Sequence, residues 1–335
     1  MGSIYIPTTQ TVALVRDLGG EVEFKTDYPV PTPGRNEVLA QVLYTGVCQS
    51  DLHTKSGTAA GPDGNPITKI KLPHVGGHEG IGRIIALGPD IEHGAGLKVG
   101  GLVGIRFSSR ICRRCEFCLA GTEQYCVAST NHLHHEDGSF QQYIALDADY
   151  LTLLPDDVDP KVMGPVLCAG LTAYKAVLNA NVRPGSWLVV VGAGGGLGHL
   201  AVQYARAQGA LVICVDTGPG KGDFVKGLGA QEYIDFAMED PVKRVQEITG
   251  LGAHAAIVTA GNAKAFAHAC DMLRGLRITG NLVGSLKECM EAVDLVRRGI
   301  VKPVIKVRPF KDLPQVYKEM ERGDIAGRIV LQLTK

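Results

Sequence analysis

One continuous stretch limits the possible folds of this chain more than any other. Residues 187–218 read "WLVVVGAGGGLGHLAVQYARAQGALVICVDTG". An apolar run, a glycine-rich turn, a helical run and a second apolar run follow one another, which is typical of a βαβ unit. The same alternation of strand and helix continues to residue 274. The second half of the chain is therefore predicted to form a parallel sheet covered by helices.

The glycine turn of this unit indicates a dinucleotide site. It is not a strict G-x-G-x-x-G: read back from Gly198 the pattern begins at Ala193, and Gly192 lies one residue too early. Backbone N–H groups at the start of the helix would bind a pyrophosphate, and Asp216 at the end of the next strand would bind the ribose hydroxyls. An acid there repels a 2′-phosphate, so NAD is predicted over NADP. The alternatives are a turn that only packs a helix and, for Lys221, a solvated side chain.

Residues 11–155 have a different pattern of apolar and polar residues. Short alternating runs such as "EVLAQVLYTG" and "GIGRIIALG" are separated by Gly, Pro and Asp, which is the pattern of an antiparallel β domain. After residue 300 the sequence predicts strand, helix and strand, which are expected to return to this first domain. The predicted fold is α/β: a β-rich domain of residues 1–157 and 300–335, and a parallel-sheet domain of residues 158–299.

Four cysteines in "ICRRCEFCLAGTEQYC" have the spacing C-x2-C-x2-C-x7-C. They are Cys112, Cys115, Cys118 and Cys126. Two-residue gaps direct neighbouring thiolates at one centre, and four thiolates close a tetrahedral zinc site. An iron–sulfur cluster or plain thiols are alternatives, but the comparable ferredoxin run continues x3-C-P, which this chain does not. A structural zinc that stabilises a loop is predicted.

A second group of potential metal ligands is dispersed along the chain. It includes the kinds of residue that bind a catalytic zinc ion. Its members are Cys48, Ser50, Asp51 and His53 in "YTGVCQSDLHT", His78 and Glu79 in "VGGHEG", and Cys168 in "VLCAGLTAY". Any one of them alone is more often a packing residue. Two Cys and one His together are the ligands of open zinc sites, in which the fourth position binds water or substrate.

The polar residues beside these ligands suggest supporting roles. Asp51 is expected to hold His78 in one tautomer, and Glu79 to tune the metal. A hydroxyl followed by an imidazole, Ser50 then His53, is a plausible route for a proton out of a buried site.

Composition excludes several classes of function. Lys and Arg number 34, and so do Asp and Glu. Zero net charge argues against nucleic-acid and membrane partners. No apolar run approaches the roughly 18 residues of a membrane helix, and the start "MGSIYIPTTQ" lacks the features of a signal peptide. A cytoplasmic protein is expected, in which the nine cysteines point to metal or catalysis before disulfides.

Taken in order, these elements resemble the zinc-dependent medium-chain alcohol dehydrogenases, most closely the fungal, yeast-type branch. The stretches that carry the resemblance include "GVCQSDLH", "LPHVGGHEG", "CRRCEFCLAGTEQYC", "DGSFQQY", "LCAGLTAYKA", "GGLGHLAVQYA" and "GRIV". The resemblance runs from about residue 12 to the C-terminus. It implies a GroES-like β domain, a Rossmann domain, two zinc ions per chain, NAD, an alcohol or aldehyde substrate and a homo-oligomer, a dimer or tetramer.

The resemblance also implies roles for particular residues. The catalytic zinc would be held by Cys48, His78 and Cys168. Glu79 would lie near it, Asp51 would support it, and Ser50 and His53 would relay the proton. The structural zinc would be held by Cys112, Cys115, Cys118 and Cys126. The cofactor would be bound by Gly192, Gly194, Gly195, Gly196, Leu197, Gly198, Asp216, Lys221 and Arg328.

The chain departs from the family in the region of the substrate pocket. Lys55 and Thr58 stand where yeast-type members have tryptophans, an extra loop "AAGPDGNPIT" follows, and Phe107 replaces another tryptophan. These differences favour a substrate bulkier or more polar than ethanol.

A second departure lies at residues 265–284, "AFAHACDMLRGLRITGNLVG". Relative to the family, roughly 25–30 residues are absent between Arg274 and Gly275, including an interior strand of the Rossmann sheet and its loop. An unpaired edge would result. The residues that follow, Leu276–Thr279, alternate like a strand.

Three hypotheses follow. The first is an NAD-linked zinc alcohol dehydrogenase, in which zinc polarises the alcohol oxygen and hydride passes to the nicotinamide. The second is an impaired or inactive zinc protein whose nicotinamide site is disrupted by the gap. The third, a zinc-free reductase of the same superfamily, conflicts with the full set of ligands.

Overall fold

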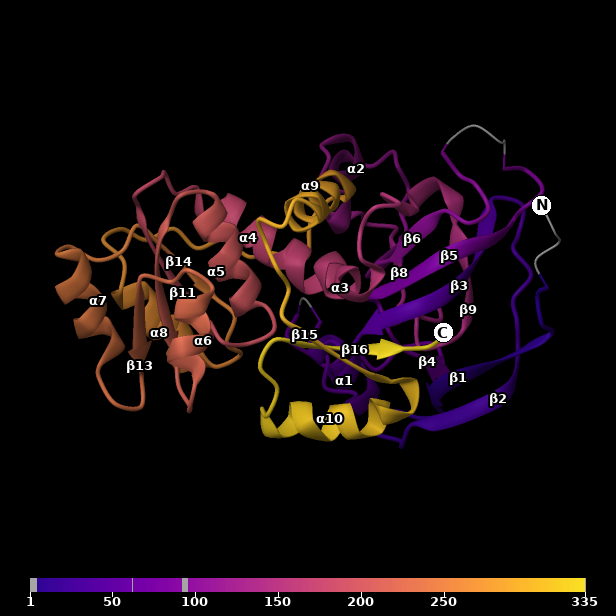
Figure 1. Ribbon diagram of the computed structural model, residues 1–335, viewed down its shortest axis with the longest axis horizontal. Coiled ribbons are helices and arrows are strands. Elements are labelled where there is room, and N and C mark those ends of the chain that lie inside the picture. The colour runs from indigo at the N-terminus through magenta and orange to yellow at the C-terminus, as the bar shows by residue number, and fades with distance from the viewer. Residues whose placement is uncertain (1–4, 62, 92–95, 335) are drawn as a thin grey trace.

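The computed structural model describes residues 5–61, 63–91 and 96–334. Two lobes lie side by side in Figure 1: residues of the first half together with the C-terminal strands on one side, and the parallel sheet with its helices on the other. The chain thus crosses between the lobes twice, at the helices that follow residue 160 and again near residue 300.

The larger lobe is built on a seven-stranded sheet, with strand order β10-β6-β5-β3-β16-β15 and β9 also paired to β3. Its strands are β3 (Glu37–Gly46), β5 (Gly80–Leu87), β6 (Leu102–Ile105), β9 (Tyr143–Asp147), β10 (Thr152–Leu154), β15 (Ile305–Pro309) and β16 (Arg328–Gln332). The last two strands, which flank α10 (Leu313–Arg322), join this sheet beside β3. β16 runs antiparallel to β3, with Val330 opposite Gly46.

Smaller sheets complete this lobe. One pairs β1 (Thr9–Val15) with β2 (Glu23–Pro29) and β4 (His74–Val75), and the other pairs β7 (Ser108–Arg110) with β8 (Thr130–Asn131). Two short helices lie at the ligand segments, α1 (Gln49–Ser56) and α2 (Glu116–Leu119). α1 begins directly after Cys48, and the Asp51 carboxylate accepts the Cys48 backbone N–H in the manner of a capping box.

The second lobe is a parallel sheet in the order β13-β12-β11-β14. Its strands are β11 (Trp187–Val191), β12 (Leu211–Asp216), β13 (Glu232–Asp235) and β14 (Ala255–Val258). The helices that cover it are α5 (Gly198–Ala207), α6 (Lys221–Gly227), α7 (Pro241–Thr249) and α8 (Ala263–Asp271). The central strand "WLVVV" is apolar throughout and buried from Leu188 to Val191, as expected of a strand covered by helices on both faces.

The helical connection between the lobes is one continuous run, Pro160–Ala180. It consists of α3 (Pro160–Pro165), a π-helical turn (Val166–Gly170) and α4 (Leu171–Ala180). By length and composition this run could cross a membrane, which the sequence analysis did not anticipate. Its most apolar window is 61% buried inside the protein, so packing against the two lobes accounts for its composition.

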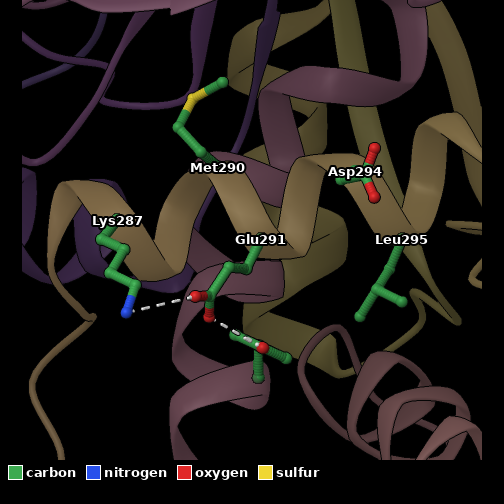
Figure 2. Close-up of a pocket in the computed structure, with 6 residues that line it drawn as sticks. Lys287, Met290, Glu291, Asp294 and Leu295 are labelled. Carbon is green, nitrogen blue, oxygen red and sulfur yellow. Dashed lines mark hydrogen bonds and ion pairs between the residues drawn. The ribbon is translucent and has the colours of Figure 1, made fainter.

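Helix α9 (Leu286–Arg297) packs against α4. It begins with a capping box in which Ser285 and Glu288 satisfy each other's backbone N–H groups. Across the contact, the Tyr174 hydroxyl donates to Glu291 over 2.9 Å, and Lys175 pairs with Glu288 at 2.5 Å. An open surface hollow lies on this face of α9, and Figure 2 shows Lys287, Glu291 and Asp294 around it.

The strand expected at Leu276–Thr279 does not form. Residues 275–284 are irregular, and the side chains of Leu276 and Ile278 are 61% and 80% exposed. Within the described residues the parallel sheet ends at β14, and pairing on its outer side is limited to an isolated bridge between Ala253, two residues before β14, and Leu273. An alternating pattern becomes a strand only where a neighbouring edge supplies hydrogen bonds, and here the pairing stops after one bridge.

His199 ties the glycine turn to the crossing near residue 300. Its Nδ1 donates to the carbonyl of Gly195 over 3.0 Å, and its Nε2 accepts the backbone N–H of Val304 over 3.2 Å. The bond accepted by Nε2 requires the neutral ring, and the residue is fully buried. Burial lowers the pKa of His199 from 6.5 to about 4.

We predict that this histidine weakens the fold in acid. A group whose folded-state pKa is depressed binds its proton more readily when unfolded, so its contribution is complete above pH 6.5 and falls as the pH drops toward 4. Between pH 7.5 and 5.0 the wild-type protein should lose about 2 kcal/mol more free energy of unfolding than His199→Gln. Urea denaturation of both proteins at the two pH values measures this difference, and equal losses would contradict the assignment.

Candidate zinc and cofactor site

Three distant segments bring two thiols, an imidazole and a carboxylate together. The potential ligand atoms of Cys48, His78, Glu79 and Cys168 all lie within 4.8 Å of one another, and all four residues are buried. The His78 Nε2 is 3.2 Å and the Cys48 Sγ 4.0 Å from the Cys168 Sγ. Cys168 lies in the π-helical turn, an irregularity that often marks functional sites. Two sulfurs and one imidazole nitrogen are a ligand set that suits zinc.

Asp51 fixes the orientation of this imidazole. Its Oδ1 accepts the His78 Nδ1–H over 2.8 Å and the Gly77 N–H over 3.1 Å, while Oδ2 accepts the Cys48 N–H over 2.9 Å. The proton on Nδ1 leaves the Nε2 lone pair directed at Cys168, where a metal would bind. Burial opposes protonation of the ring, but the Asp51 charge outweighs it and raises the pKa of His78.

Glu79 forms a buried ion pair with Arg328, which is the first residue of β16. Both side chains are nearly inaccessible to solvent, and the Arg328 Nη2 donates to the Glu79 Oε1. Burial raises the pKa of Glu79 to about 7, although the Arg328 charge opposes the shift. The second oxygen, Oε2, is buried and has no hydrogen-bond partner among the described residues, so it remains available to a metal ion or its ligand.

Arg328 also reaches the glycine turn. A Cβ atom added to Gly196 would lie 2.9 Å from both Cδ and Nη1 of Arg328. One guanidinium therefore contacts the ligand cluster through Glu79 and the cofactor turn through Gly196. The ligand cluster and the parallel sheet are joined by this side chain.

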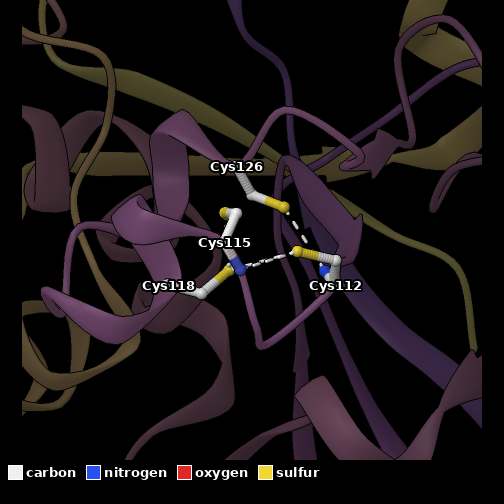
Figure 3. A group of neighbouring side chains, drawn as sticks. All are labelled: Cys112, Cys115, Cys118 and Cys126. Atoms are coloured by element: carbon white, nitrogen blue, oxygen red, sulfur yellow. Dashed lines mark hydrogen bonds between the residues drawn. The ribbon is translucent and has the colours of Figure 1, made fainter.

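The four clustered cysteines form a second, separate site (Figure 3). The Cys115 Sγ is 3.6 Å from the Cys118 Sγ, which is 4.0 Å from the Cys112 Sγ. Backbone N–H groups bond to two of the sulfurs, from Cys115 to Cys112 and from Cys112 to Cys126. Hydrogen bonds from the backbone of Arg114 and Cys115 lower the pKa of Cys112 to about 6, which favours a thiolate ligand. Four sulfurs leave no open position.

The glycine turn has the close packing expected of a cofactor loop. Gly192 has φ = +81°, and a Cβ at Gly198 would lie 2.1 Å from the Gly192 carbonyl oxygen, so both positions require glycine. The Thr259 hydroxyl, at the end of β14, donates to the carbonyls of Val191 and Gly192. The turn is thus fixed by the neighbouring strand.

Asp216 lies at the mouth of this turn and is already oriented. The Gly194 N–H donates to its Oδ2 over 2.7 Å, and the Lys221 Nζ contacts its Oδ1 at 2.8 Å. Asp216 is buried, whereas Lys221 is partly exposed. The structure places all the predicted cofactor residues, from Gly192 to Gly198 with Asp216, Lys221 and Arg328, around one turn.

The two predicted relay residues lie on α1 beside the ligand cluster. The Ser50 Oγ is 3.8 Å from the Cys48 Sγ. His53 is exposed, and its Nε2 lies 3.2 Å from the Gln49 amide. Among the described hydrogen bonds none joins Ser50 to His53 directly. The Phe107 ring packs edge-on to the His78 ring at 6.4 Å, which places it next to the metal ligand.

Comparison with known proteins agrees with this architecture. Residues 34–156 match the GroES-like domain of alcohol dehydrogenases, and residues 196–297 match the zinc-binding dehydrogenase family. The chain is 37% identical to an alcohol dehydrogenase of Schizosaccharomyces pombe over 358 aligned positions, which cover 98% of this chain and 99% of the relative. It belongs to the zinc-dependent medium-chain alcohol dehydrogenases.

Further relatives support the same family and its fungal branch. Alcohol dehydrogenase 1 of Emericella nidulans is 37% identical and covers 98% of this chain and 99% of its own. A solved structure of an NAD-dependent alcohol dehydrogenase is 27% identical, with a TM-score of 0.85 and 97% of this chain and 100% of that chain covered. The 358 positions aligned to the Schizosaccharomyces protein exceed the 335 residues of this dehydrogenase. The relative thus carries residues that this chain lacks.

Sequence reasoning missed three residues of the dehydrogenase's site. Thr259 fixes the glycine turn, His199 binds its Gly195 carbonyl, and Gln49 contacts His53. Gln49 and His53 are four residues apart on α1, and a helix predicted at this segment would have shown their contact. Thr259 and His199 act through backbone carbonyls of distant segments, which no local spacing reveals.

Metal analysis of three proteins tests the two ligand sets separately. We predict two zinc ions per chain for the wild-type dehydrogenase, and one each for Cys115→Ser and Cys168→Ser, since each variant loses one ligand of one site. Cys115→Ser should also lower the melting temperature, because a closed site stabilises its loop. Cys270→Ser, which changes a cysteine outside both clusters, is the matched control and should keep two. One zinc in the wild-type protein would contradict the assignment.

A double-mutant cycle tests the buried ion pair. Arg328→Met alone leaves the Glu79 carboxylate buried without its partner, which should cost about 3–5 kcal/mol of unfolding free energy. The pair Arg328→Met with Glu79→Gln should recover most of this loss, since no unpaired charge remains. Denaturant unfolding of the wild type, the two single variants and the double variant measures these free energies. Additive losses would show that the two side chains do not interact.

Proposed function

We propose that this dehydrogenase interconverts an alcohol with an aldehyde or ketone, with NAD(H) as the hydride carrier. The observation that carries the proposal is the double contact of Arg328, which joins the Cys48–His78–Cys168 cluster through Glu79 to the glycine turn through Gly196. A substrate at the ligand cluster and a cofactor on the turn would therefore meet between the lobes. The comparisons give no support to the alternative of an inactive zinc protein.

Each residue then has a defined task. Bound at this cluster and on the turn, zinc would supply a Lewis acid for the alcohol oxygen and NAD would supply the hydride acceptor. Cys48, Cys168 and His78 would hold the metal, and Asp51, bound to the His78 Nδ1, would orient the ring so that Nε2 faces the metal. Glu79, which has one oxygen without a hydrogen-bond partner among the described residues, would adjust the charge around the metal. The four-cysteine cluster would hold the second zinc and stabilise its loop.

The proton released from the alcohol must reach solvent. Ser50 lies beside Cys48 at the cluster, and His53 is exposed on the same helix. Ser50 would accept the proton from the substrate hydroxyl and pass it to His53, either after a rotation of the side chain or through a water molecule. Hydride leaves to the cofactor and the proton to solvent, so the oxidation balances.

The environment of Asp216 supports NAD over NADP. Its carboxylate is buried at the mouth of the turn and paired with Lys221. The carboxylate would accept hydrogen bonds from the adenosine ribose hydroxyls, and its charge would repel a 2′-phosphate at the same place. Backbone N–H groups of residues 196–198 at the start of α5, with the Arg328 guanidinium, would bind the pyrophosphate.

We also infer the wider organisation and the substrate class. Residues 1–157 and 300–335 would form the catalytic domain and residues 158–299 the cofactor domain, in a cytoplasmic homo-oligomer. Phe107, against His78, would line the substrate pocket, and the smaller ring of Phe compared with Trp favours a substrate bulkier than ethanol.

Initial rates with a series of alcohols test this function. We expect NADH formation with NAD and much slower formation with NADP, and loss of activity after chelation of zinc with recovery on adding zinc back. Protein with two zinc ions that forms no NADH from any alcohol in the series would contradict the proposal. Transfer to NADP alone would contradict the role of Asp216.

The predicted role of Phe107 has its own test. Phe107→Trp should narrow the pocket, so the ratio of kcat/KM for benzyl alcohol to that for ethanol should fall about tenfold or more, which corresponds to about 1.4 kcal/mol. Phe117→Trp, an aromatic exchange beside the four-cysteine cluster and its neighbour Tyr125, should leave the ratio unchanged. An unchanged ratio in Phe107→Trp would place this ring outside the substrate pocket.

A further inference from the structure

The outer edge of β14 is open along most of its length. The His254 N–H donates inward, to Trp187 of β11, whereas the Ala253 N–H donates outward, to the carbonyl of Met272. Because hydrogen-bonding direction alternates along a strand, the N–H and C=O groups of Ala255 and Ile257 point outward too. No strand of the described residues pairs with them.

The chain itself begins to pair with this edge and then leaves it. Ala253 donates to Met272 over 2.8 Å and accepts the Arg274 N–H over 3.2 Å, which is the first rung of a parallel ladder. Continued in the same register, the ladder pairs Ala255 with Gly275 and Ile257 with Arg277.

This register suits the side chains of the segment. Leu276 and Ile278 would lie on the same face as Ala256 and Val258, which pack into the cluster around Val189 and Val191. At present Leu276 and Ile278 are largely exposed to solvent. The side chain of Arg277 would face the other side of the sheet.

The present path of the segment is strained at its far end. Val283 has φ = +38°, a left-handed conformation that a β-branched residue rarely adopts. The segment is held there by a hydrogen bond between the side chains of Asn179 and Asn281. Val283 also packs against the hydrophobic core. Closure of residues 275–279 would give up the exposed asparagine bond and would gain the burial of two apolar side chains and a ladder.

A strand in this position would end beside the cofactor. Asp216 on β12 marks the adenosine side of the turn, and Thr259 at the end of β14 contacts Gly192. The nicotinamide half would extend in the opposite direction from Asp216, past the end of β14. The carboxyl end of the next strand would then lie next to it, since ligands of parallel sheets bind at these ends.

We propose that residues 275–279 close along β14 as a fifth parallel strand when NAD(H) binds, and that Gly280 and Asn281 then line the nicotinamide half of the site. The proposal rests on the proposed function. A cofactor that contacts these residues only in the closed state shifts the population toward it. The segment would thus replace the interior strand that this chain lacks.

A pair of proline variants tests the hydrogen bonds of the closed strand. In the ladder, the N–H groups of Leu276 and Ile278 face β14, and that of Arg277 faces away. Ile278→Pro should weaken NADH binding at least tenfold, whereas Arg277→Pro, with the same loss of backbone freedom one residue earlier, should bind within about twofold of the wild type. Zinc content and melting temperature show that both variants are folded. Equal affinities of the two variants would overturn the proposal.

Hydrogen exchange of the full, zinc-loaded chain gives a second readout. Amides of peptides that contain residues 275–280 should exchange at least tenfold more slowly with saturating NADH than without it. NADH binding without this protection overturns the closure but leaves the proposed function intact, whereas failure to bind NADH overturns both. Protection that rises with protein concentration and needs no NADH would assign the edge to a second copy of the chain, which also overturns the closure.

Discussion

The buried ion pair between Arg328 and Glu79 is the interaction on which the arrangement of the site depends. Each charge is removed from water at a cost that only its partner offsets. Arg328 is in the last strand and Glu79 directly follows the ligand His78, 249 positions apart in sequence. The same guanidinium lies against Gly196 of the cofactor turn. The positions of the metal ligands and of the turn are therefore linked through one side chain.

The rest of the larger lobe places these two residues together. β16 pairs with β3 so that Val330 lies opposite Gly46, and the Gly46 N–H donates to the Glu79 carbonyl over 2.9 Å. A Cβ at Gly46 would lie 2.0 Å from the Glu79 Oε2, so this position has no space for a side chain. The Glu79 Oε2 can occupy its position only because residue 46 is glycine. On the other side of the cluster, the Asp51 carboxylate accepts three hydrogen bonds, one each from Cys48, Gly77 and His78.

Sequence reasoning succeeded where local spacing carries the chemistry. The C-x2-C gaps predicted that four cysteines would converge, and the βαβ pattern predicted the parallel strands β11 and β12 with the glycine turn between them. The convergence of Cys48, His78 and Cys168 came from the kinds of residue present and from the family resemblance, because no spacing joins segments so far apart. The pairing of Arg328 with Glu79 could not be predicted, since it depends on the register of β16 against β3.

The strand predicted at Leu276–Thr279 fails for a related reason. Its alternation is a property of the segment alone, whereas a strand needs an edge in reach and in register. The pairing along this edge stops at the isolated bridge between Ala253 and Leu273, before β14 begins. Thr259, which the sequence did not single out, shows the same dependence on a neighbour, because its hydroxyl acts only when β14 lies beside β11.

The most direct test of the central claim, that the ligand cluster and the glycine turn bring an alcohol carbon and a nicotinamide together, is isotope transfer. The zinc-loaded protein is incubated with NAD and an alcohol in which every hydrogen on the carbinol carbon is replaced by deuterium, and the NADH is examined by mass spectrometry. The account predicts one deuterium in each NADH formed, because the hydride passes from carbon to carbon without exchange with water. NADH without deuterium, or aldehyde formed without NADH, would contradict it.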